Sequence, residues 1–95
     1  MINQCILVGL VVSTREAEDR MHLTIKTKRY EMGGAHHIDH IPVSYDKETL
    51  DVGGHITTGI TVGIKGHMVM HEEGYLMIEV EKLSLIKLKG TENDA

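Results

Sequence analysis

The 95-residue sequence predicts an all-β protein, a single small barrel built from five strands. Apolar residues recur with a period of two in several stretches, as expected for strands with one buried face. Glycines interrupt these stretches where a barrel strand has to bend. Only one stretch has room for a helix, and its Gly and Thr content makes it a poor helix former. A chain of this length supports one hydrophobic core, so one domain is expected.

Residues 59–70 (GITVGIKGHMVM) have the most regular strand pattern in the chain. One face is expected to pack inward, and its apolar positions are Ile60, Val62, Ile64, Met68 and Met70. Gly63 and Gly66 interrupt the pattern and contribute no side chain to the packing. The strand is therefore expected to bend sharply or to lie close to another backbone.

Residues 1–12 (MINQCILVGLVV) predict a first strand that is apolar on both faces. Ile6 and Val8 lie on one face, and Leu7 lies beside Gly9 on the other. Such a strand is either central in a sheet or half-covered by a partner subunit. Residues 13–20, which are rich in Arg, Glu and Asp, predict a charged turn.

The next two strands are predicted over residues 21–31 and 36–45. The first of them has an inward face of Met21, Leu23, Ile25 and Thr27, and its second face is cationic. Between the two strands, Gly33-Gly34 predicts the tip of a hairpin. Pro42 indicates an edge position or a bulge, because it cannot donate a hydrogen bond to a ladder.

Residues 46–59 are expected to hold at most a turn or two of helix, around residues 47–52. Residues 71–74 predict a short acidic hairpin, and residues 75–88 predict the last strand. The inward positions of that strand are Leu76, Ile78, Val80 and either Leu83 or Leu85. The domain is expected to span residues 1–90, followed by a disordered tail over residues 91–95.

These elements describe a five-stranded Greek-key barrel of the oligonucleotide-binding (OB) type, with a short helical or irregular insert between the third and fourth strands. An SH3-like barrel is the main alternative.

The charge balance supplies no general attraction to nucleic acid or to an anionic membrane, because the net charge is −4 with neutral histidines. Protonating all seven histidines would change it to +3. The single cysteine, Cys5, excludes an internal disulfide, and no targeting signal precedes the first strand. No stretch approaches the roughly 18 apolar residues that span a bilayer. A cytoplasmic protein without membrane attachment is expected.

Four segments, in this order, carry a resemblance to a known family: MINQCILVG (1–9), LTIKTKR (23–29), HIPVSY (40–45), and GITVGIKGHM with IEVEKLSLI (59–68 and 78–86). Over nearly its whole length the chain resembles the core domain of the bacterial single-stranded DNA-binding protein family. The resemblance implies an OB barrel that binds single-stranded DNA during replication, repair and recombination. It also implies a homodimer or homotetramer, and the apolar first strand suits the pairing edge.

The chain departs from the family in its aromatic residues and in its last residues. The family stacks bases on aromatic side chains, and here only Tyr45 falls at a clear matching position, with Tyr30 close to another. Residues 69–73 (VMHEE) replace a basic, aromatic stretch. The ending TENDA lacks the family's acidic, Pro-containing tip, so strong recruitment of partner proteins is not expected.

The candidate nucleic-acid-binding residues are Lys26, Lys28, Arg29, Tyr30, Tyr45, Lys65 and Tyr75. The cations of the second strand can track phosphates, and Lys65 is expected on a neighbouring strand; the alternative is an ordinary solvated face. Tyr45 and Tyr75 are each either a base-stacking platform or a residue that fills the end of the barrel.

A metal site and an enzyme are both disfavoured. The cluster of His36, His37, Asp39 and His40 contains metal-ligand types. In a strand, however, His36 and His37 point to opposite faces. No phosphate-binding Gly-rich loop, nucleophile motif or facing carboxylate pair is present, and Cys5 has no cationic neighbour. No metal, cofactor or catalytic residue is expected.

The sequence therefore favours a non-catalytic single-stranded DNA-binding module that uses backbone electrostatics and sparse stacking. The alternative is an OB-fold interaction or assembly module that has lost strong nucleic-acid binding, which the net charge and the scarce aromatics favour.

Overall fold

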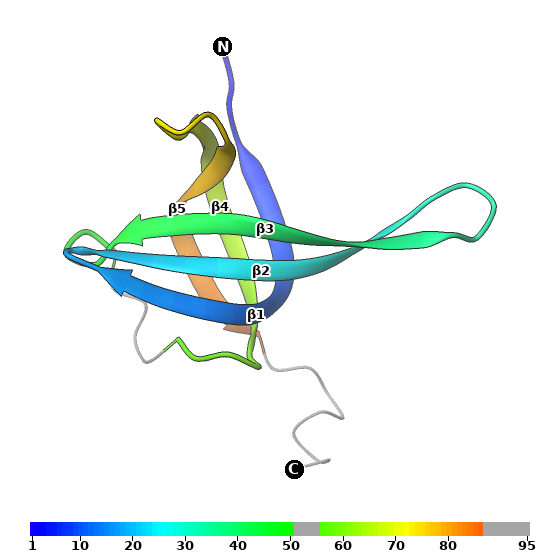
Figure 1. The fold of residues 1–95 in the computed structure, drawn as a ribbon, viewed down its shortest axis with the longest axis horizontal. Coiled ribbons are helices and arrows are strands. Elements are labelled where there is room, and N and C mark those ends of the chain that lie inside the picture. Colours follow the sequence, from blue (N-terminus) through cyan, green and yellow to red (C-terminus); the bar gives the residue numbers. More distant parts are fainter. Residues whose placement is uncertain (51–55, 87–95) are drawn as a thin grey trace.

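The computed structural model describes residues 1–50 and 56–86, which form a closed β-barrel (Figure 1). Its strands are β1 (Cys5–Ala17), β2 (Arg20–Tyr30), β3 (His36–Asp46), β4 (Thr61–Met70) and β5 (Leu76–Ile86). They pair in the order β1-β2-β3-β5-β4, and β4 returns to β1. Only the pairing of β3 with β5 is parallel. The predicted five-stranded barrel is confirmed.

The core is aliphatic apart from one tyrosine. Its buried residues are Val11, Leu23, Ile25, Val43, Tyr45, Ile56, Val62, Ile64, Ile78 and Val80. On β2, Leu23 and Ile25 are buried while Thr24 and Lys26 are only partly buried, as the predicted alternation requires. The even-numbered residues of β2 therefore lie on the outside of the barrel.

β1 is displaced along the chain relative to the prediction: it begins at Cys5 and not at Met1, and residues 13–17 continue the strand instead of forming a turn. The turn into β2 is confined to residues 18–19, where Glu18 has a φ of 54°. A register shift between Val11 and Ser13 marks a bulge in β1. The second half of β1 pairs with β2, and residues 5–9 pair with β4 alone. In the part of the chain that is described, the other edge of residues 5–9 has no strand partner.

β4 bends at Gly66, where the sequence predicted a close backbone approach. A Cβ on Gly66 would overlap the carbonyl oxygen of Glu79 on β5, and the β4–β5 register shifts between Lys65 and Gly66. Beyond this bulge Met68 and Met70 are exposed, so the prediction that they face the core is wrong. The extra residue of the bulge, Glu81, belongs to β5, so the alternation of β4 itself is not broken. Met68 and Met70 lie opposite Ile78 and Leu76, at the hairpin end of the sheet, and are exposed there.

β5 follows its predicted pattern in the middle and departs from it at its start. Ile78 and Val80 are buried, and Leu83 packs against the core whereas Leu85 is half exposed. Leu76 is also half exposed, contrary to the prediction, because it pairs with Met70 at the hairpin end of the sheet. Residues 87–88 of the predicted strand lie outside the described residues.

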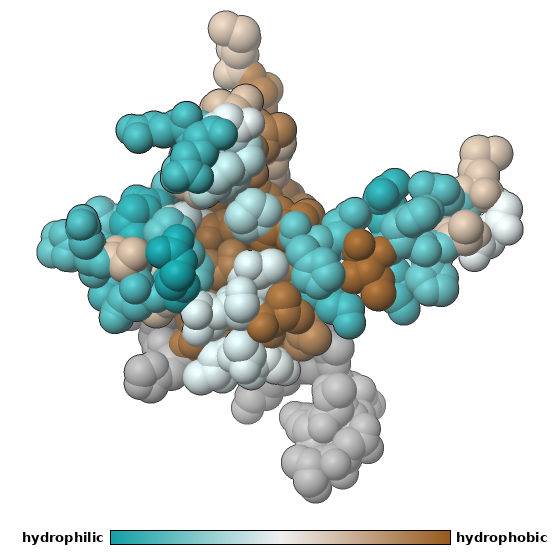
Figure 2. Space-filling model, in the orientation of Figure 1, coloured by the Kyte–Doolittle hydropathy of each residue, from teal (hydrophilic) through white to brown (hydrophobic). Residues whose placement is uncertain are grey.

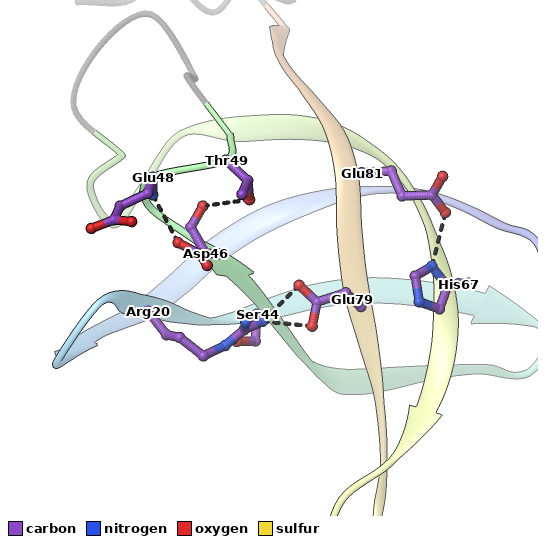
Figure 3. A network of polar contacts seen from close by, with 8 residues as sticks. All are labelled: Arg20, Ser44, Asp46, Glu48, Thr49, His67, Glu79 and Glu81. Atoms are coloured by element: carbon purple, nitrogen blue, oxygen red, sulfur yellow. Dashed lines mark hydrogen bonds and ion pairs between the residues drawn. The ribbon is translucent and has the colours of Figure 1, made fainter.

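After β3, residues 47–49 form a turn and no helix. The backbone amides of Thr49 and Leu50 donate to the carbonyl oxygen of Asp46, and the amide of Glu48 donates to the Asp46 side chain (Figure 3). The helical turn predicted to reach residue 52, the domain boundary at residue 90 and the tail over 91–95 lie outside the described residues.

Arg20 links three strands at the point where the barrel has its shortest strand pairing. β3 and β5 pair at only two positions. Arg20 Nη2 donates to both carboxylate oxygens of Glu79 at 2.6 Å, and its Nε donates to Ser44 Oγ at 2.9 Å (Figure 3). These contacts join β2 to β5 across β3. β3 pairs with β5 only at Val43 and Ser44, and Pro42 directly precedes this pair. Its edge toward β5 is therefore unpaired, which fits the predicted edge position.

β2 and β3 continue past the barrel as a two-stranded arm, residues 27–39 (Figure 1). Their pairing runs without a break to Tyr30 opposite His36. Gly33 and Gly34 form the tip with positive φ values of 95° and 90°, as predicted. A lone two-stranded ribbon is marginally stable in water. Contacts between side chains along the arm therefore matter for its order.

Candidate nucleic-acid interface

A groove of about 360 Å³ lies between the outside of β1, β2 and β3 and the end of β5 next to the β4–β5 hairpin. Its lining residues are Ser13, Thr14, Arg15, His22, Leu23, Thr24, Pro42, Val43, Tyr75 and Met77. None of them is acidic. In OB barrels the face of strands 2 and 3, with the loops between strands 1 and 2 and strands 4 and 5, is where oligonucleotides bind. The groove lies on that face.

An aromatic pair stands at the mouth of the groove. The rings of His71 and Tyr75 are stacked, with their centroids 4.5 Å apart and their planes 11° apart. Backbone hydrogen bonds of 2.8 Å from His71 to Tyr75 and from Gly74 to His71 hold the hairpin in this shape. Tyr75 remains 43% exposed, so its ring is accessible for stacking. A stacked base contributes about 1 to 3 kcal/mol.

Arg15 and His22 lie opposite each other on β1 and β2 and line the groove. Burial is the main cause that lowers the pKa of His22. The positive charges of Arg15, Arg20 and His71 lower this pKa further, and the carboxylate of Glu79 opposes them. A phosphate bound beside His22 would favour its protonated form.

The arm has two faces of different chemistry, because side chains alternate along each strand. One face is occupied by ion pairs. Arg29 Nε lies 3.0 Å from Asp39 Oδ2, and Arg29 Nη1 lies 3.2 Å from Glu31 Oε1, which is also 3.3 Å from His37 Nε2. The hydrogen bond from Arg29 holds the pKa of the Asp39 carboxyl below its usual range. The Arg29–Asp39 and His37–Glu31 contacts join the two sides of the hairpin and stabilise the arm, and Arg29 is occupied by both carboxylates.

The opposite face of the arm, with the adjoining part of the barrel, carries no carboxylate. The residues on it are Lys26, Lys28, Tyr30, His36, Ile38 and His40. Register places Lys26 opposite His40, and neither Lys26 nor Lys28 takes part in an ion pair within residues 1–50 and 56–86. Together with the groove, this surface is called the β2–β3 face below. From His22 to Tyr30 it extends over about 26 Å.

Four of the predicted site residues lie on the β2–β3 face or at its groove: Lys26, Lys28, Tyr30 and Tyr75. Figure 2 shows that the arm is mainly hydrophilic, with a few hydrophobic side chains. Tyr30 is 74% exposed, with its ring centroid 6.0 Å from that of His36. These positions agree with contact to an extended ligand.

Three predicted site residues do not join this surface. Tyr45 is 3% exposed and belongs to the core, so its ring is not available for stacking, and burial raises the pKa of its hydroxyl. Lys65 lies on β4, which is a neighbour of β1 and β5 and is separated from β2 by β1. Its expected place on a neighbouring strand is therefore wrong. Arg29 lies on the other face of the arm, held by carboxylates.

The candidate residues omitted Arg15, His22 and His71. His22 alternates with Leu23 in the same way as Lys26, so the strand pattern already contained the signal for it. The sequence predicts a turn at Arg15, and the structure places this residue in β1. His71 comes next to the groove by stacking on Tyr75, a contact within the β4–β5 hairpin that the sequence pattern does not specify.

The histidine-rich stretch of β3 divides as strand alternation requires, with His36 and His40 on the β2–β3 face and His37 on the other. No group of three or more His, Cys, Asp or Glu side chains among the described residues is arranged to hold a metal ion. In the same residues, no helix is long and apolar enough to cross a membrane.

No protein-family model and no curated protein sequence matches the chain. Solved structures do match it. PriB from Ralstonia solanacearum superposes with a TM-score of 0.69 at 15% identity, covering 92% of this chain and 100% of that one. A dimeric N-terminal domain of PriB from Thermoanaerobacter tencongensis has a TM-score of 0.64 at 16% identity, covering 90% and 98%. A small single-stranded DNA-binding protein from Mycoplasma pneumoniae has a TM-score of 0.64 at 18% identity, covering 95% and 98%.

At these identities the likeness establishes the fold, and the predicted OB barrel is confirmed. The barrel also matches part of an enzyme: asparaginyl-tRNA synthetase from Pyrococcus horikoshii has a TM-score of 0.63 at 18% identity, covering 88% of this chain and 19% of that one. The fold alone therefore does not decide between a binding protein and a module of an enzyme.

Proposed function

We propose that this protein is a non-catalytic single-stranded DNA-binding protein whose ligand lies along the β2–β3 face. The observation that carries the proposal is the segregation of charge on the arm. Carboxylates gather on one face, where they pair with Arg29. Lys26 and Lys28 are left on the other face beside Tyr30. A chain with a net charge of −4 thus still offers a local cationic track to phosphates.

The mode of binding follows from the small number of aromatic residues on this face. Tyr75 and Tyr30 are its only tyrosines, and the sequence has neither Trp nor Phe. Stacking therefore contributes at two points of the path, and phosphate contacts by Arg15, Lys26 and Lys28 supply the rest. Affinity for one protomer is expected to be low and to fall steeply with salt.

Self-association through the first strand would strengthen such binding. Residues 5–9 of β1 pair on one side only, and there Ile6 is 80% and Val8 55% exposed. An open, apolar strand edge is a template for pairing with another chain. A structural neighbour, the PriB domain from Thermoanaerobacter tencongensis, is dimeric. Joining two or four weak sites would raise the affinity for a long strand through effective concentration.

We expect this role to belong to DNA replication, repair or recombination in the cytoplasm, carried out by one OB domain that spans residues 1–90. The support is the sequence resemblance together with the shared fold, and Cys5 as the single cysteine.

A second candidate is an OB-fold interaction or assembly module with little affinity for nucleic acid. The acidic tip of the β4–β5 hairpin favours it, because Glu72 and Glu73 are exposed on the hairpin that leads to Tyr75 and repel phosphates.

A gel shift with labelled oligo-dT at low salt, run at pH 6 and pH 8, separates the two candidates. A shifted band supports DNA binding, and no shift at either pH supports the interaction module. Light scattering of the same sample gives the oligomeric state. Ile6→Glu should yield monomers, whereas the control Ile38→Glu, on the arm, should not. A wild-type monomer, or an unchanged oligomer in Ile6→Glu, would refute pairing through β1.

A further inference from the structure

Five of the six histidines that the structure describes fall into two groups with different partners, and the sixth is His71. His37 and His67 lie off the β2–β3 face and contact carboxylates: His37 Nε2 is 3.3 Å from Glu31 Oε1, and His67 Nδ1 is 2.9 Å from Glu81 Oε2 (Figure 3). His22, His36 and His40 lie on the β2–β3 face, and within the described ranges none of them pairs with a carboxylate. Position and charge environment thus separate the two groups.

The groups around His22 come from every neighbouring strand. Arg15 faces it from β1 and Ser44 from β3, and Arg20 lies two residues before it on β2. Glu79 on β5 is the acidic group in this set, and both of its oxygens already bind Arg20 at 2.6 Å. His71 adds a further imidazole from the hairpin, with its Nδ1 accepting a hydrogen bond from the Glu73 amide at 3.1 Å.

His40 and His36 have similarly cationic or neutral partners. His40 lies opposite Lys26, and on its other side a pocket of about 430 Å³ is lined by apolar residues such as Met68 and Leu76. The acidic group near His40 is its chain neighbour Asp39, which interacts with the charge of His40 but points to the opposite face and is bound by Arg29. His36 lies opposite Tyr30 near the tip. A proton on any of these imidazoles therefore adds positive charge where little negative charge offsets it.

We propose that His22, His36 and His40 are phosphate-binding residues in their protonated form, so that a single strand of nucleic acid binds to this face together with protons. The inference rests on the proposed function and specifies how the same site is regulated. Histidine is suited to this task because its ordinary pKa of about 6.5 lies close to physiological pH. Binding of the anionic backbone favours the charged imidazoles, and mild acid therefore favours binding.

Counting charges gives the expected size of the effect. With neutral histidines the face presents three positively charged side chains, those of Arg15, Lys26 and Lys28. Protonation of the three imidazoles would double that number. Each neutralised phosphate of a single strand contributes about −0.7 to the slope of log K against log salt, so the slope should steepen from about −2 to about −4. The affinity at low salt should rise by about tenfold or more when the three imidazoles are protonated.

The test is fluorescence anisotropy of labelled oligo-dT with the full chain, from pH 5.5 to 8 at several salt concentrations. Thymine bases do not gain protons in this range, so protons taken up belong to the protein.

The double variant His36→Gln/His40→Gln removes two exposed histidines from the face. His37→Gln/His67→Gln removes two from elsewhere and changes the net charge equally. The face variant should lose most of the gain in affinity at low pH, and the matched variant should keep it. Adding His22→Gln to the face variant should remove the remaining dependence of affinity on pH.

Two results would overturn the inference and leave the proposed function standing. One is wild-type binding that does not change with pH. The other is an equal loss of pH dependence in both double variants, which would show that net charge, and not position on the face, controls affinity. Absence of wild-type binding at every pH and at low salt would remove the proposed function as well. Both double variants alter exposed or half-exposed side chains, so a thermal melt at each pH suffices to show that they fold.

Discussion

Gly66 on β4 lies directly against the backbone carbonyl of Glu79 on β5, so closely that a Cβ on Gly66 would overlap the oxygen. The two strands change register at this point. Beyond it the sheet continues into the hairpin that carries Tyr75, and Glu79 reaches Arg20 on β2. This close backbone approach thus lies between the hairpin that leads to Tyr75 and the ion pair that joins β5 to β2.

Gly66→Ala should lower the free energy of unfolding by about 1 to 3 kcal/mol, because the new methyl group has to displace backbone. Gly63→Ala is the matched control. Its Cβ would meet only the side chain of Ile86, with Cδ1 at 3.1 Å, and that flexible end can move. The control should change stability by less than about 1 kcal/mol. Urea denaturation measures both, and equal losses would argue against the close contact.

Lys28→Ala should weaken binding to oligo-dT and reduce the salt slope by about 0.7, because Lys28 lies on the β2–β3 face without an ion pair among the described residues. Arg29→Ala should have little effect on the slope, because Arg29 binds Asp39 and Glu31 on the opposite face. Titrations at three salt concentrations compare the variants. A larger effect from Arg29 than from Lys28 would reverse the assignment of the two faces.

Tyr75→Leu should weaken binding by about 1 to 3 kcal/mol, because it removes the exposed stacking surface at the mouth of the groove. Tyr45→Phe should leave the affinity unchanged, because the Tyr45 ring is buried in the core. Oligo-dT should also quench tyrosine fluorescence less in Tyr75→Leu than in the wild type. Quenching that is lost in Tyr45→Phe but kept in Tyr75→Leu would contradict the structure.

The folded protein without ligand should lose part of its stability as the pH falls through about 6.5, owing to His22. Its pKa is lower in the folded than in the unfolded chain, chiefly because of burial. The unfolded chain therefore takes up this proton more readily, and the contribution present above the ordinary pKa disappears on acidification. His22→Gln should gain stability relative to the wild type between pH 7.5 and 5.5 in urea denaturation. An unchanged difference over that range would show that His22 titrates normally.

The alternation of apolar residues determined where the strands run and which side of each central segment faces the core. Leu23 and Ile25 on β2, and Ile78 and Val80 on β5, are buried as the pattern predicted. The glycine pair Gly33-Gly34 also predicted the tip of the β2–β3 hairpin correctly. These features follow from local geometry, because a strand exposes opposite faces at successive residues and only glycine adopts positive φ without strain.

The tertiary structure decided which side chains are neighbours, because strand order and curvature depend on contacts between residues that are far apart in the sequence. The barrel placed β1 between Lys65 and the cations of β2. It buried Tyr45, and it left Met68 and Met70 exposed at the hairpin end of β4. Arg29 pairs with Asp39 because β2 and β3 lie side by side in the arm. A sequence pattern gives the face of a residue within its own strand, and the closed barrel determines which residues form a common surface.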